Sequence, residues 1–363
     1  MSEEFLLGVN YWPARKFVRM WSQFDAREID RDFAALEHLG LRLVRLFLFW
    51  PDFQLHPDTI EELHLGNLTC VFDLAAAHGL LLMPTLLVGL MSGPAWMPAW
   101  SLSTAPNNRP AVYVVDGEVS RYKPRDLFGT DAAMLDAQRL LVRTVVQRFA
   151  SHRALWGWDL CNEVNLVQMP ETEAGEHWLE VLTGDVHAVD PNHPVTAGVL
   201  VFEGARKGFR LQSHRLVDVA SVHAYPLYDP AASGPTDVDY VARKIEITGT
   251  AAGVPVMLTE FGMSVNPRPG SSSVTGRVGG VERSVHLVDE QEAAAFVRRV
   301  LPVAREAGAI GALIWCFSDY DPSLYNDFTF TAFPHERYFG IFDPSGRLKA
   351  TGEAMRQFAQ SIG

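Results

Sequence analysis

Cysteine is scarce in this sequence, and several common catalytic signatures are missing. Its three cysteines, Cys70, Cys161 and Cys316, fit no metal-ligand spacing. Cys161 and Cys316 lie in apolar runs, which is typical of buried thiols. The chain has no His-Glu-x-x-His, Walker or Gly-x-Ser-x-Gly motif. We therefore expect no metal ion and no other cofactor.

Acidic residues outnumber basic ones, and the sequence has no long apolar run. With 31 Lys and Arg against 43 Asp and Glu, the formal net charge is −12. This balance, without any basic cluster, argues against a nucleic-acid partner. No apolar run reaches membrane-spanning length, and Met1 to Phe5 lack the basic start of a signal peptide. We expect a cytoplasmic protein without a membrane partner, unless a leader has been removed.

Short apolar runs alternate with longer amphipathic segments along the whole chain. Each run is almost continuously apolar, as in parallel strands that are covered on both faces. The eight predicted strands are Phe5–Trp12, Leu43–Phe49, Leu80–Val88, Leu155–Glu163, Pro194–Val201, Val217–Tyr225, Pro255–Gly262 and Gly311–Asp319.

Helical patterns fill the segments between these runs. Asp25 to Leu39 begins with a capping residue, has Glu28 three positions on, and stops at Gly40. A second helix shows Met134, Ala137, Leu141 and Val145 on one face. A third is predicted from Asp289 to Ala307, before Gly308.

Eight strands with intervening helices predict an α/β fold, a single (β/α)₈ barrel over residues 1–363. A doubly wound open sheet is the alternative, but its Gly-rich loop after the first strand is missing, since that strand runs into Tyr11-Trp12-Pro13. No linker rich in Pro, Gly and Ser divides the chain, so we expect one domain.

Three connections that follow strands are long, and in a barrel they lie at the C-terminal rim. They are Gly89–Thr130, Met263–Asp289 and Tyr320–Tyr338. The first, an insertion over residues 89–130, contains Val112 to Tyr122, whose Asp116-Gly117 centre predicts a hairpin. Ser271 to Gly280 is rich in Ser and Gly and is expected to be mobile. Its Gly276 to Gly280 cluster suits a loose loop better than a phosphate cradle.

Two predicted strands end in a carboxylate. Leu155 to Glu163 closes with Asn162-Glu163, and Pro255 to Gly262 contains Glu260 near its end. Glutamates at the C-terminal ends of barrel strands point toward one rim, and glycoside hydrolysis needs such a pair. A single glutamate of this kind is usually a capping or ion-paired residue, but the matched pair favours catalysis.

With these residues in place, the sequence resembles glycoside hydrolase clan A, and family five most closely. The clan's Asn-Glu at the end of the fourth strand matches Asn162 and Glu163, and its seventh-strand nucleophile matches Glu260 in Thr-Glu-Phe-Gly. Further matches, in order across nearly the whole chain, are the second-strand Arg45, the sixth-strand His223 and Tyr225, and the eighth-strand Trp315.

The resemblance implies a role for each residue in a retaining double displacement. Glu163 is the expected acid/base, Glu260 the nucleophile, and Asn162 a ligand of the sugar 2-hydroxyl. Arg45 is suited to orienting and ionising Glu260, although an ordinary ion pair inside the barrel is equally compatible. Tyr225 would donate to Glu260, His223 would shape the same pocket, and Trp315 would form the sugar floor.

The sequence indicates the substrate less clearly than the type of reaction. Gly-Val-Asn-Tyr-Trp-Pro and Arg-Leu-Phe-Leu-Phe-Trp-Pro look similar to β-mannosidases and mannanases of family five, so we favour β-linked mannosides, with β-glucosides or β-glucans second. Rim aromatics suit stacking on sugar rings. They are Trp12, Trp96, Trp100, Trp158, Tyr320 and Phe330.

Other questions stay open at this stage. The usual third-strand His of the family is missing from Leu87-Val88-Gly89-Leu90-Met91, so either the subfamily is atypical or a loop repairs the pocket. A long third-strand hairpin would favour exo over endo action. A catalytically silent carbohydrate-binding barrel and a barrel lyase or isomerase remain alternatives, and the sequence gives no oligomeric state.

Overall fold

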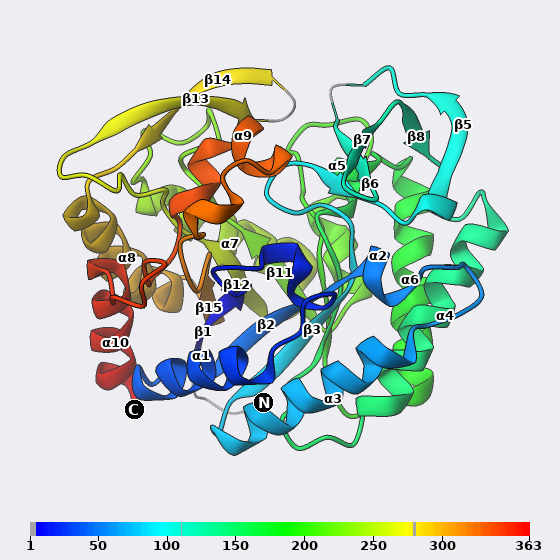
Figure 1. Cartoon of the computed structure of the whole chain (residues 1–363), viewed down its shortest axis with the longest axis horizontal. Coiled ribbons are helices and arrows are strands. Elements are labelled where there is room, and N and C mark those ends of the chain that lie inside the picture. Colours follow the sequence, from blue (N-terminus) through cyan, green and yellow to red (C-terminus); the bar gives the residue numbers. More distant parts are fainter. Residues whose placement is uncertain (1–4, 110, 279–280) are drawn as a thin grey trace.

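A closed barrel of eight parallel strands forms the centre of the computed structural model, which describes residues 5–109, 111–278 and 281–363. The strands follow one another around the barrel in chain order, and β15 closes it against β1 (Figure 1). They are β1 (Leu6–Tyr11), β2 (Leu43–Phe49), β3 (Leu81–Val88), β9 (Trp158–Asn162), β10 (Val195–Gly198), β11 (Val219–His223), β12 (Val256–Phe261) and β15 (Ala309–Ile314). The predicted (β/α)₈ barrel is confirmed.

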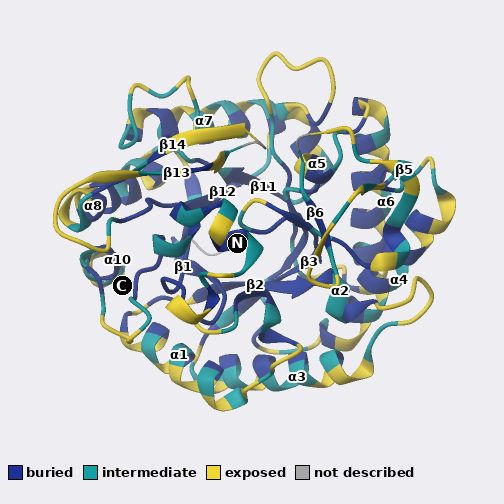
Figure 2. Cartoon of the chain, turned by 45° about the horizontal axis from the view of Figure 1, so that its top comes forward, coloured by how far each residue is buried: buried dark blue, intermediate teal, exposed yellow. Residues whose placement is uncertain are grey.

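Helices surround the strands as an outer ring, with their buried faces inward (Figure 2). The long ones are α1 (Ala26–His38), α3 (Glu62–Ala77), α4 (Ala132–Phe149), α6 (Thr172–Val189), α7 (Val238–Ala252), α8 (Glu290–Glu306) and α10 (Ala350–Ile362). Between β10 and β11 the 3₁₀ helix η3 (Leu211–Leu216) takes the place of an α-helix. The short helices are η1 (Phe17–Met20), α2 (Trp50–Phe53), η2 (Ala99–Ser101), α5 (Val164–Val167), η4 (Pro322–Leu324), α9 (Phe328–Ala332) and η5 (Pro334–Tyr338).

The strands are buried from end to end because helices cover one face and the barrel interior the other. Every residue of β2, β9 and β12 is buried. A methyl group at Gly8 would lie 1.7 Å from the carbonyl oxygen of Leu43, so only glycine lets β1 approach β2 this closely.

Two predicted strands are shorter than expected at the ends that carry polar residues. The strand predicted to reach Glu163 stops at Asn162, because Glu163 adopts a left-handed backbone conformation (φ 45°, ψ 34°). The strand predicted to reach Asp319 stops at Ile314. Beyond it the chain turns away, and the Asp319 carboxylate pairs with the buried Lys349 ammonium at 2.8 Å.

The predicted start of α1 is confirmed, but by a different set of contacts. The Asp25 side chain caps the helix by accepting a hydrogen bond from the Arg27 amide (3.0 Å). Glu28, expected in a capping box, instead pairs with Lys16 at 2.7 Å. Gly40 follows the helix with φ +72°, a conformation that suits glycine.

The long rim connections carry small sheets. The predicted hairpin forms between β6 (Tyr113–Val115) and β7 (Glu118–Ser120), with Asp116 and Gly117 both at positive φ. Strand β4 (Ala95–Trp96) pairs with β6, and β5 (Leu102–Pro106) pairs with β8 (Tyr122–Pro124). These strands all belong to the predicted insertion over residues 89–130.

The connection after β12 differs from its prediction. The Ser/Gly-rich segment was expected to be an irregular, mobile loop, but β13 (Ser272–Val278) pairs with β14 (Val281–Leu287) in seven antiparallel residue pairs. Gly276 lets this hairpin pack against η5, because a methyl group there would lie 2.8 Å from the His335 ring. Met1 to Glu4, Pro110 and the Gly279-Gly280 end of the glycine cluster lie outside the described residues.

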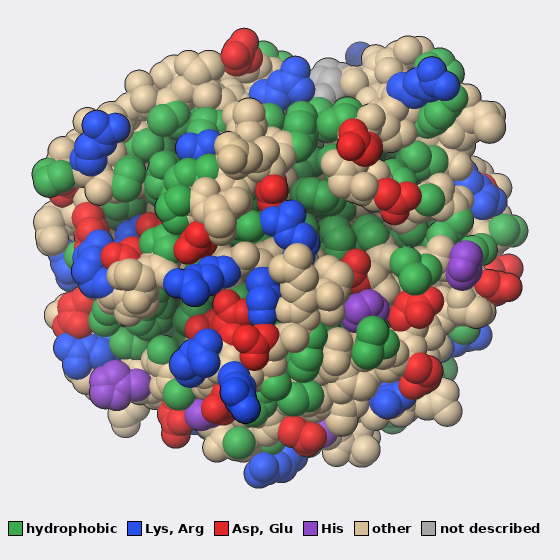
Figure 3. Space-filling model, viewed as in Figure 1, with side chains coloured by type: hydrophobic (Ala, Val, Ile, Leu, Met, Phe, Trp, Pro, Cys, Tyr) green, Lys and Arg blue, Asp and Glu red, His purple; other side chains and the backbone are tan. Residues whose placement is uncertain are grey.

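Acidic and basic side chains are interspersed on the face shown in Figure 3. Within residues 5–109, 111–278 and 281–363, none of the helices combines the length and apolar character needed to cross a bilayer.

Replacing Asp25 by Ala should lower the urea concentration at the midpoint of unfolding, because the first turn of α1 loses its capping oxygen. Asp25→Asn keeps an acceptor and is the matched control, expected to unfold close to the wild-type midpoint. Urea unfolding of both variants measures this. Equal losses in the two variants would show that the cap contributes nothing.

Candidate active site

A cavity of about 880 Å³ opens at the C-terminal ends of the barrel strands. Its lining includes residues at the ends of four strands, namely Asn162 on β9 and Glu163 directly after it, His223 on β11, Glu260 on β12 and Trp315 after β15. Tyr225 joins them from the loop after β11. The structure therefore brings together six of the residues singled out from the sequence.

Glu163 is placed by its unusual backbone. Its amide donates to the carbonyl oxygen of Gly198 (2.6 Å). Glu163 directly follows the last residue of β9 and has a left-handed backbone conformation. A non-glycine residue in this conformation is held there by its surroundings. The side chain reaches His223, whose Nδ1 lies 2.8 Å from the carboxylate oxygen Oε1.

Glu260 is held from two sides at the end of β12. Its Oε1 accepts a hydrogen bond from Nη1 of Arg45, and its Oε2 accepts one from the Tyr225 hydroxyl (2.8 Å). Only 5% of the residue is exposed. Both oxygens are thus fixed in direction, which is what a nucleophilic carboxylate requires.

Arg45 lies beneath the pocket and is completely buried. Besides Glu260, its guanidinium donates to Asp159 (2.8 Å), to the amide oxygen of Asn10 (3.1 Å) and to that of Asn162 (2.9 Å). Arg45 was grouped with the substrate-binding residues, but it does not line the cavity. It acts on Glu260 and Asn162 from below.

The two glutamates meet at one point. A carboxylate oxygen of Glu163, one of Glu260 and a ring nitrogen of His223 all lie within 4.8 Å of one another. This spacing is close to the separation of about 5–5.5 Å that retaining glycosidases use, and shorter than the gap that leaves room for a water in inverting enzymes.

The surroundings of the two glutamates differ in charge. Burial raises the pKa of Glu163 from its ordinary 4.5 to about 7, although the Arg45 charge opposes the rise. Burial also lowers the pKa of His223 to about 4, so this ring is neutral near pH 7. With a pKa of about 7, Glu163 holds its proton in about half of the molecules at pH 7, whereas Glu260 carries the direct contact with the cation. This division suits one acid and one nucleophile.

A backbone carbonyl contacts Asn162 in the segment where the family's third-strand histidine was expected. The Asn162 side-chain amide donates to the carbonyl oxygen of Leu90 (2.9 Å), in the segment where the histidine was expected. Arg45 holds the other end of the same amide. Asn162 is therefore fixed in orientation, with its remaining N–H available at the cavity wall.

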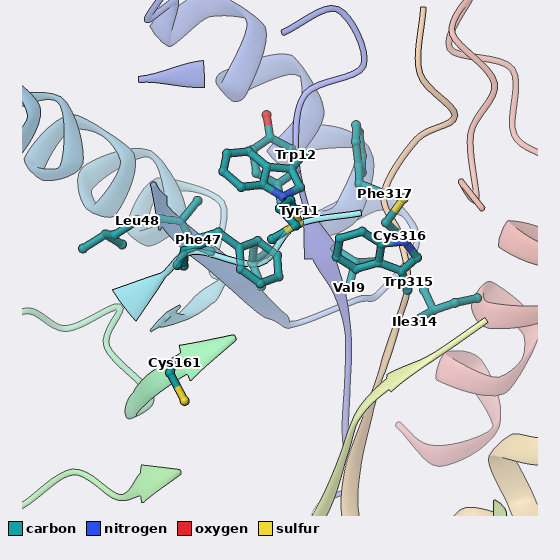
Figure 4. Close-up of a cluster of buried hydrophobic side chains, with 14 of the residues drawn as sticks. Val9, Tyr11, Trp12, Phe47, Leu48, Cys161, Ile314, Trp315, Cys316 and Phe317 are labelled. Atoms are coloured by element: carbon teal, nitrogen blue, oxygen red, sulfur yellow. The ribbon is translucent and has the colours of Figure 1, made fainter. Parts of the chain in front are cut away.

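None of the six rim aromatics expected to stack on sugar rings lines the cavity. Trp12 is 1% exposed and stacks on Phe47 at 5.5 Å, within the apolar cluster shown in Figure 4. Trp96 packs edge-on against Phe49 and does not line the cavity. Outside the cavity as well are Trp100, Trp158, Tyr320 and Phe330. Trp315 is the predicted aromatic that does line it, with Phe47 against its edge.

Three further residues of the cavity and its hydrogen-bond network, Asp159, Tyr228 and Glu336, were not predicted from the sequence. Asp159, three residues before the end of β9, accepts from Arg45 and from the Thr85 hydroxyl (2.7 Å). The strand periodicity that places Asp159 inside the barrel was a usable signal. Tyr228 and Glu336 line the cavity from loops, where no spacing rule points to them.

The group Glu163, His223 and Glu260 has a spacing that a metal ion would also tolerate. Each of its acidic members, however, already has a protein partner, His223 for Glu163 and both Arg45 and Tyr225 for Glu260. These contacts suit an acid and a nucleophile without requiring an ion.

No protein-family model matches the chain, but known proteins and solved structures are similar to it. A rice protein (Oryza sativa subsp. japonica) described as a putative mannan endo-1,4-β-mannosidase 5 is 23% identical over 348 residues, which cover 86% of this chain and 66% of the rice protein.

Solved structures extend the likeness over almost the whole chain. The exo-β-1,4-mannosidase from Opitutaceae bacterium strain TAV5 has a TM-score of 0.76 and 26% identity, covering 99% of this chain and 60% of that protein. A variant GH5_18 protein from Streptomyces cattleya in complex with Manβ1-4GlcNAc has a TM-score of 0.77 and 21% identity, covering 98% and 80%. The chain thus spans about two thirds of the rice relative and less of the Opitutaceae one.

The raised pKa of Glu163 predicts a pH-dependent stability. Between pH 4.5 and about 7 the folded protein keeps the proton that the unfolded chain releases, so stability falls as pH rises through this window. Glu163→Gln removes the effect. Between pH 4 and pH 8, the free energy of unfolding of the wild type should fall by about 3 kcal/mol relative to that of the variant, as measured by urea unfolding.

Glu180→Gln, at an exposed helical position, is the control and should follow the wild type at every pH. A stability difference between Glu163→Gln and wild type that stays constant with pH would contradict the assignment.

Proposed function

We propose that this chain, a family-5-like member of glycoside hydrolase clan A, is a retaining β-glycoside hydrolase that acts on β-mannosides. The observation that carries the proposal is the Glu163–Glu260 pair, with carboxylate oxygens within 4.8 Å of each other and opposite electrostatic surroundings.

In the first step Glu260 attacks the anomeric carbon while Glu163 gives its proton to the leaving glycosidic oxygen. Arg45 and Tyr225 fix both oxygens of Glu260, so the attacking lone pair is already aimed. The pKa of about 7 keeps the Glu163 proton in place until the leaving oxygen takes it.

In the second step the ionised Glu163 removes a proton from water, which attacks the glycosyl-enzyme and restores Glu260. His223 orients Glu163 through its Nδ1 in both steps. Asn162, held by Arg45 and the Leu90 carbonyl, presents an N–H to the sugar 2-hydroxyl, a contact that strengthens as positive charge develops at the ring. Trp315 lies where a sugar ring would rest on it.

A β-linked mannoside is the substrate that the relatives favour. The rice relative is described as an endo-mannosidase, the Opitutaceae relative as an exo-mannosidase, and the Streptomyces variant holds Manβ1-4GlcNAc. We therefore place mannose at the catalytic centre and leave β-glucosides second.

The shape of the cavity favours exo action. Within the described chain, no residue before Leu90 lines the cavity, so its wall is built without the loops after β1 and β2. The loop after β3 packs tightly against the loop after β15, where a methyl group at Gly93 would lie 2.4 Å from the Phe333 ring, and we take this as the closed side. The loop after β10 forms a more open part of the wall, where Phe202 is 42% exposed.

A silent carbohydrate-binding barrel explains the site less well. A binder has no need of two carboxylates that converge on one point, one held by a buried cation and the other kept protonated by burial. A lyase or isomerase would need one base rather than this pair.

Replacing Glu260 by Ala should reduce hydrolysis of an aryl β-mannoside to background, and added azide should then yield the α-mannosyl azide by direct displacement. Replacing Glu163 by Ala should slow turnover by about 10²- to 10⁴-fold, and azide should then yield the β-mannosyl azide. Product NMR distinguishes the two anomers. Wild-type turnover by Glu260→Ala would refute the assignment.

Digestion of manno-oligosaccharides should release mannose alone at early times, because the packing of Gly93 against Phe333 closes that side of the cavity to a longer chain. Chromatography of the products over the first tenth of the reaction tests this. Early release of mannobiose or longer products would exclude exo action.

A further inference from the structure

We infer that Glu336 binds a free hydroxyl of the terminal sugar on the side of the ring opposite the scissile bond, and so selects chain ends. This inference rests on the proposed function and adds a substrate-recognition residue to it.

Glu336 lies in η5, on the loop that closes the cavity, and its side chain is 12% exposed. That exposed part opens into the cavity, whose wall it shares with Phe333, Phe339 and Trp315. Glu163 and Glu260 are both near enough to raise the pKa of Glu336. The pocket thus holds a third carboxyl group that the double displacement does not use.

The protein satisfies this carboxyl group only in part. The Tyr228 hydroxyl donates to Oε1 at 3.2 Å, and Nε2 of His335 lies 3.5 Å from the same oxygen. The Ser92 hydroxyl is buried close enough to lower the pKa of Glu336, but makes no well-formed hydrogen bond with any described residue. Oε2 therefore has no well-formed hydrogen bond in the described part of the chain.

Because Glu336 lines the cavity and its side chain is 12% exposed, solvent or a ligand completes the hydrogen bonds of this oxygen. A purely structural carboxyl would be expected to have both oxygens paired. Sugar hydroxyls are suitable ligands, because O–H donors form short, charge-assisted bonds with carboxylates. The Ser92 hydroxyl, facing the same space, offers a second partner.

The position of Glu336 indicates which hydroxyl it meets. The anomeric carbon must lie between Glu163 and Glu260, and the leaving group extends toward the open side. The hydroxyl at C4 is across the pyranose ring, toward the closed side that carries Glu336. In a β-1,4-linked chain this oxygen bears the next sugar, so a carboxylate that requires its O–H accepts only a terminal residue.

The test compares an aryl β-mannoside with its 4-deoxy analogue in wild type and Glu336→Gln. For the 4-hydroxy substrate, Glu336→Gln should lower kcat/KM by roughly 10²-fold, the loss expected for one charge-assisted hydrogen bond. For the 4-deoxy substrate, wild type and variant should agree within about threefold. Tyr228→Phe removes one donor to Glu336. It should also lower kcat/KM for the 4-hydroxy substrate relative to the 4-deoxy substrate, by a smaller factor than Glu336→Gln.

Each substrate serves as an internal control, because misfolding would reduce turnover of both. Glu180→Gln should leave both values unchanged, and thermal unfolding should show that each variant is folded. Equal losses on both substrates in a folded Glu336→Gln, or no loss on either, would overturn the inference while wild-type hydrolysis still supports the proposed function. Failure of the wild type to hydrolyse any β-glycoside would overturn both.

Discussion

The buried guanidinium of Arg45 is the interaction on which the site depends. It donates to Asp159, Glu260, Asn10 and Asn162, and so links β2 to β9, β12 and β1 through one cation. Removing one partner from such a buried charge costs about 3–5 kcal/mol, because the remaining charges are left without solvent or counter-ion. The same contacts therefore hold the barrel top together and aim the carboxylate of Glu260.

The three carboxyl groups of the cavity differ in their contacts and burial. Glu260 contacts the cation directly, whereas burial raises the pKa of Glu163 and of Glu336 to about 7. Glu163 lies beside His223, and Glu336 receives a hydrogen bond from the Tyr228 hydroxyl.

The sequence predicted the barrel well because eight apolar runs, each covered on both faces, leave few other arrangements. It also predicted Glu163 and Glu260, since strand ends in a barrel share one rim. The prediction that Trp12 and Trp96 contact substrate was wrong, because an aromatic residue after a strand can lie in the core or at the rim. Trp12 packs on Phe47 and Trp96 on Phe49, which places both away from the cavity. Glu336 was missed because it lies in an irregular loop, and β13–β14 because strand pairing overrode a composition typical of loops.

The most direct test is to trap the covalent intermediate with a 2-deoxy-2-fluoro-β-mannosyl fluoride and locate the label by peptide mass spectrometry. The account predicts one label per chain, on Glu260, and its loss when Arg45 is replaced by Met. A label on Glu163 or Glu336, or on an Arg45→Met variant at the wild-type rate, would contradict the claim that the buried cation selects the nucleophile.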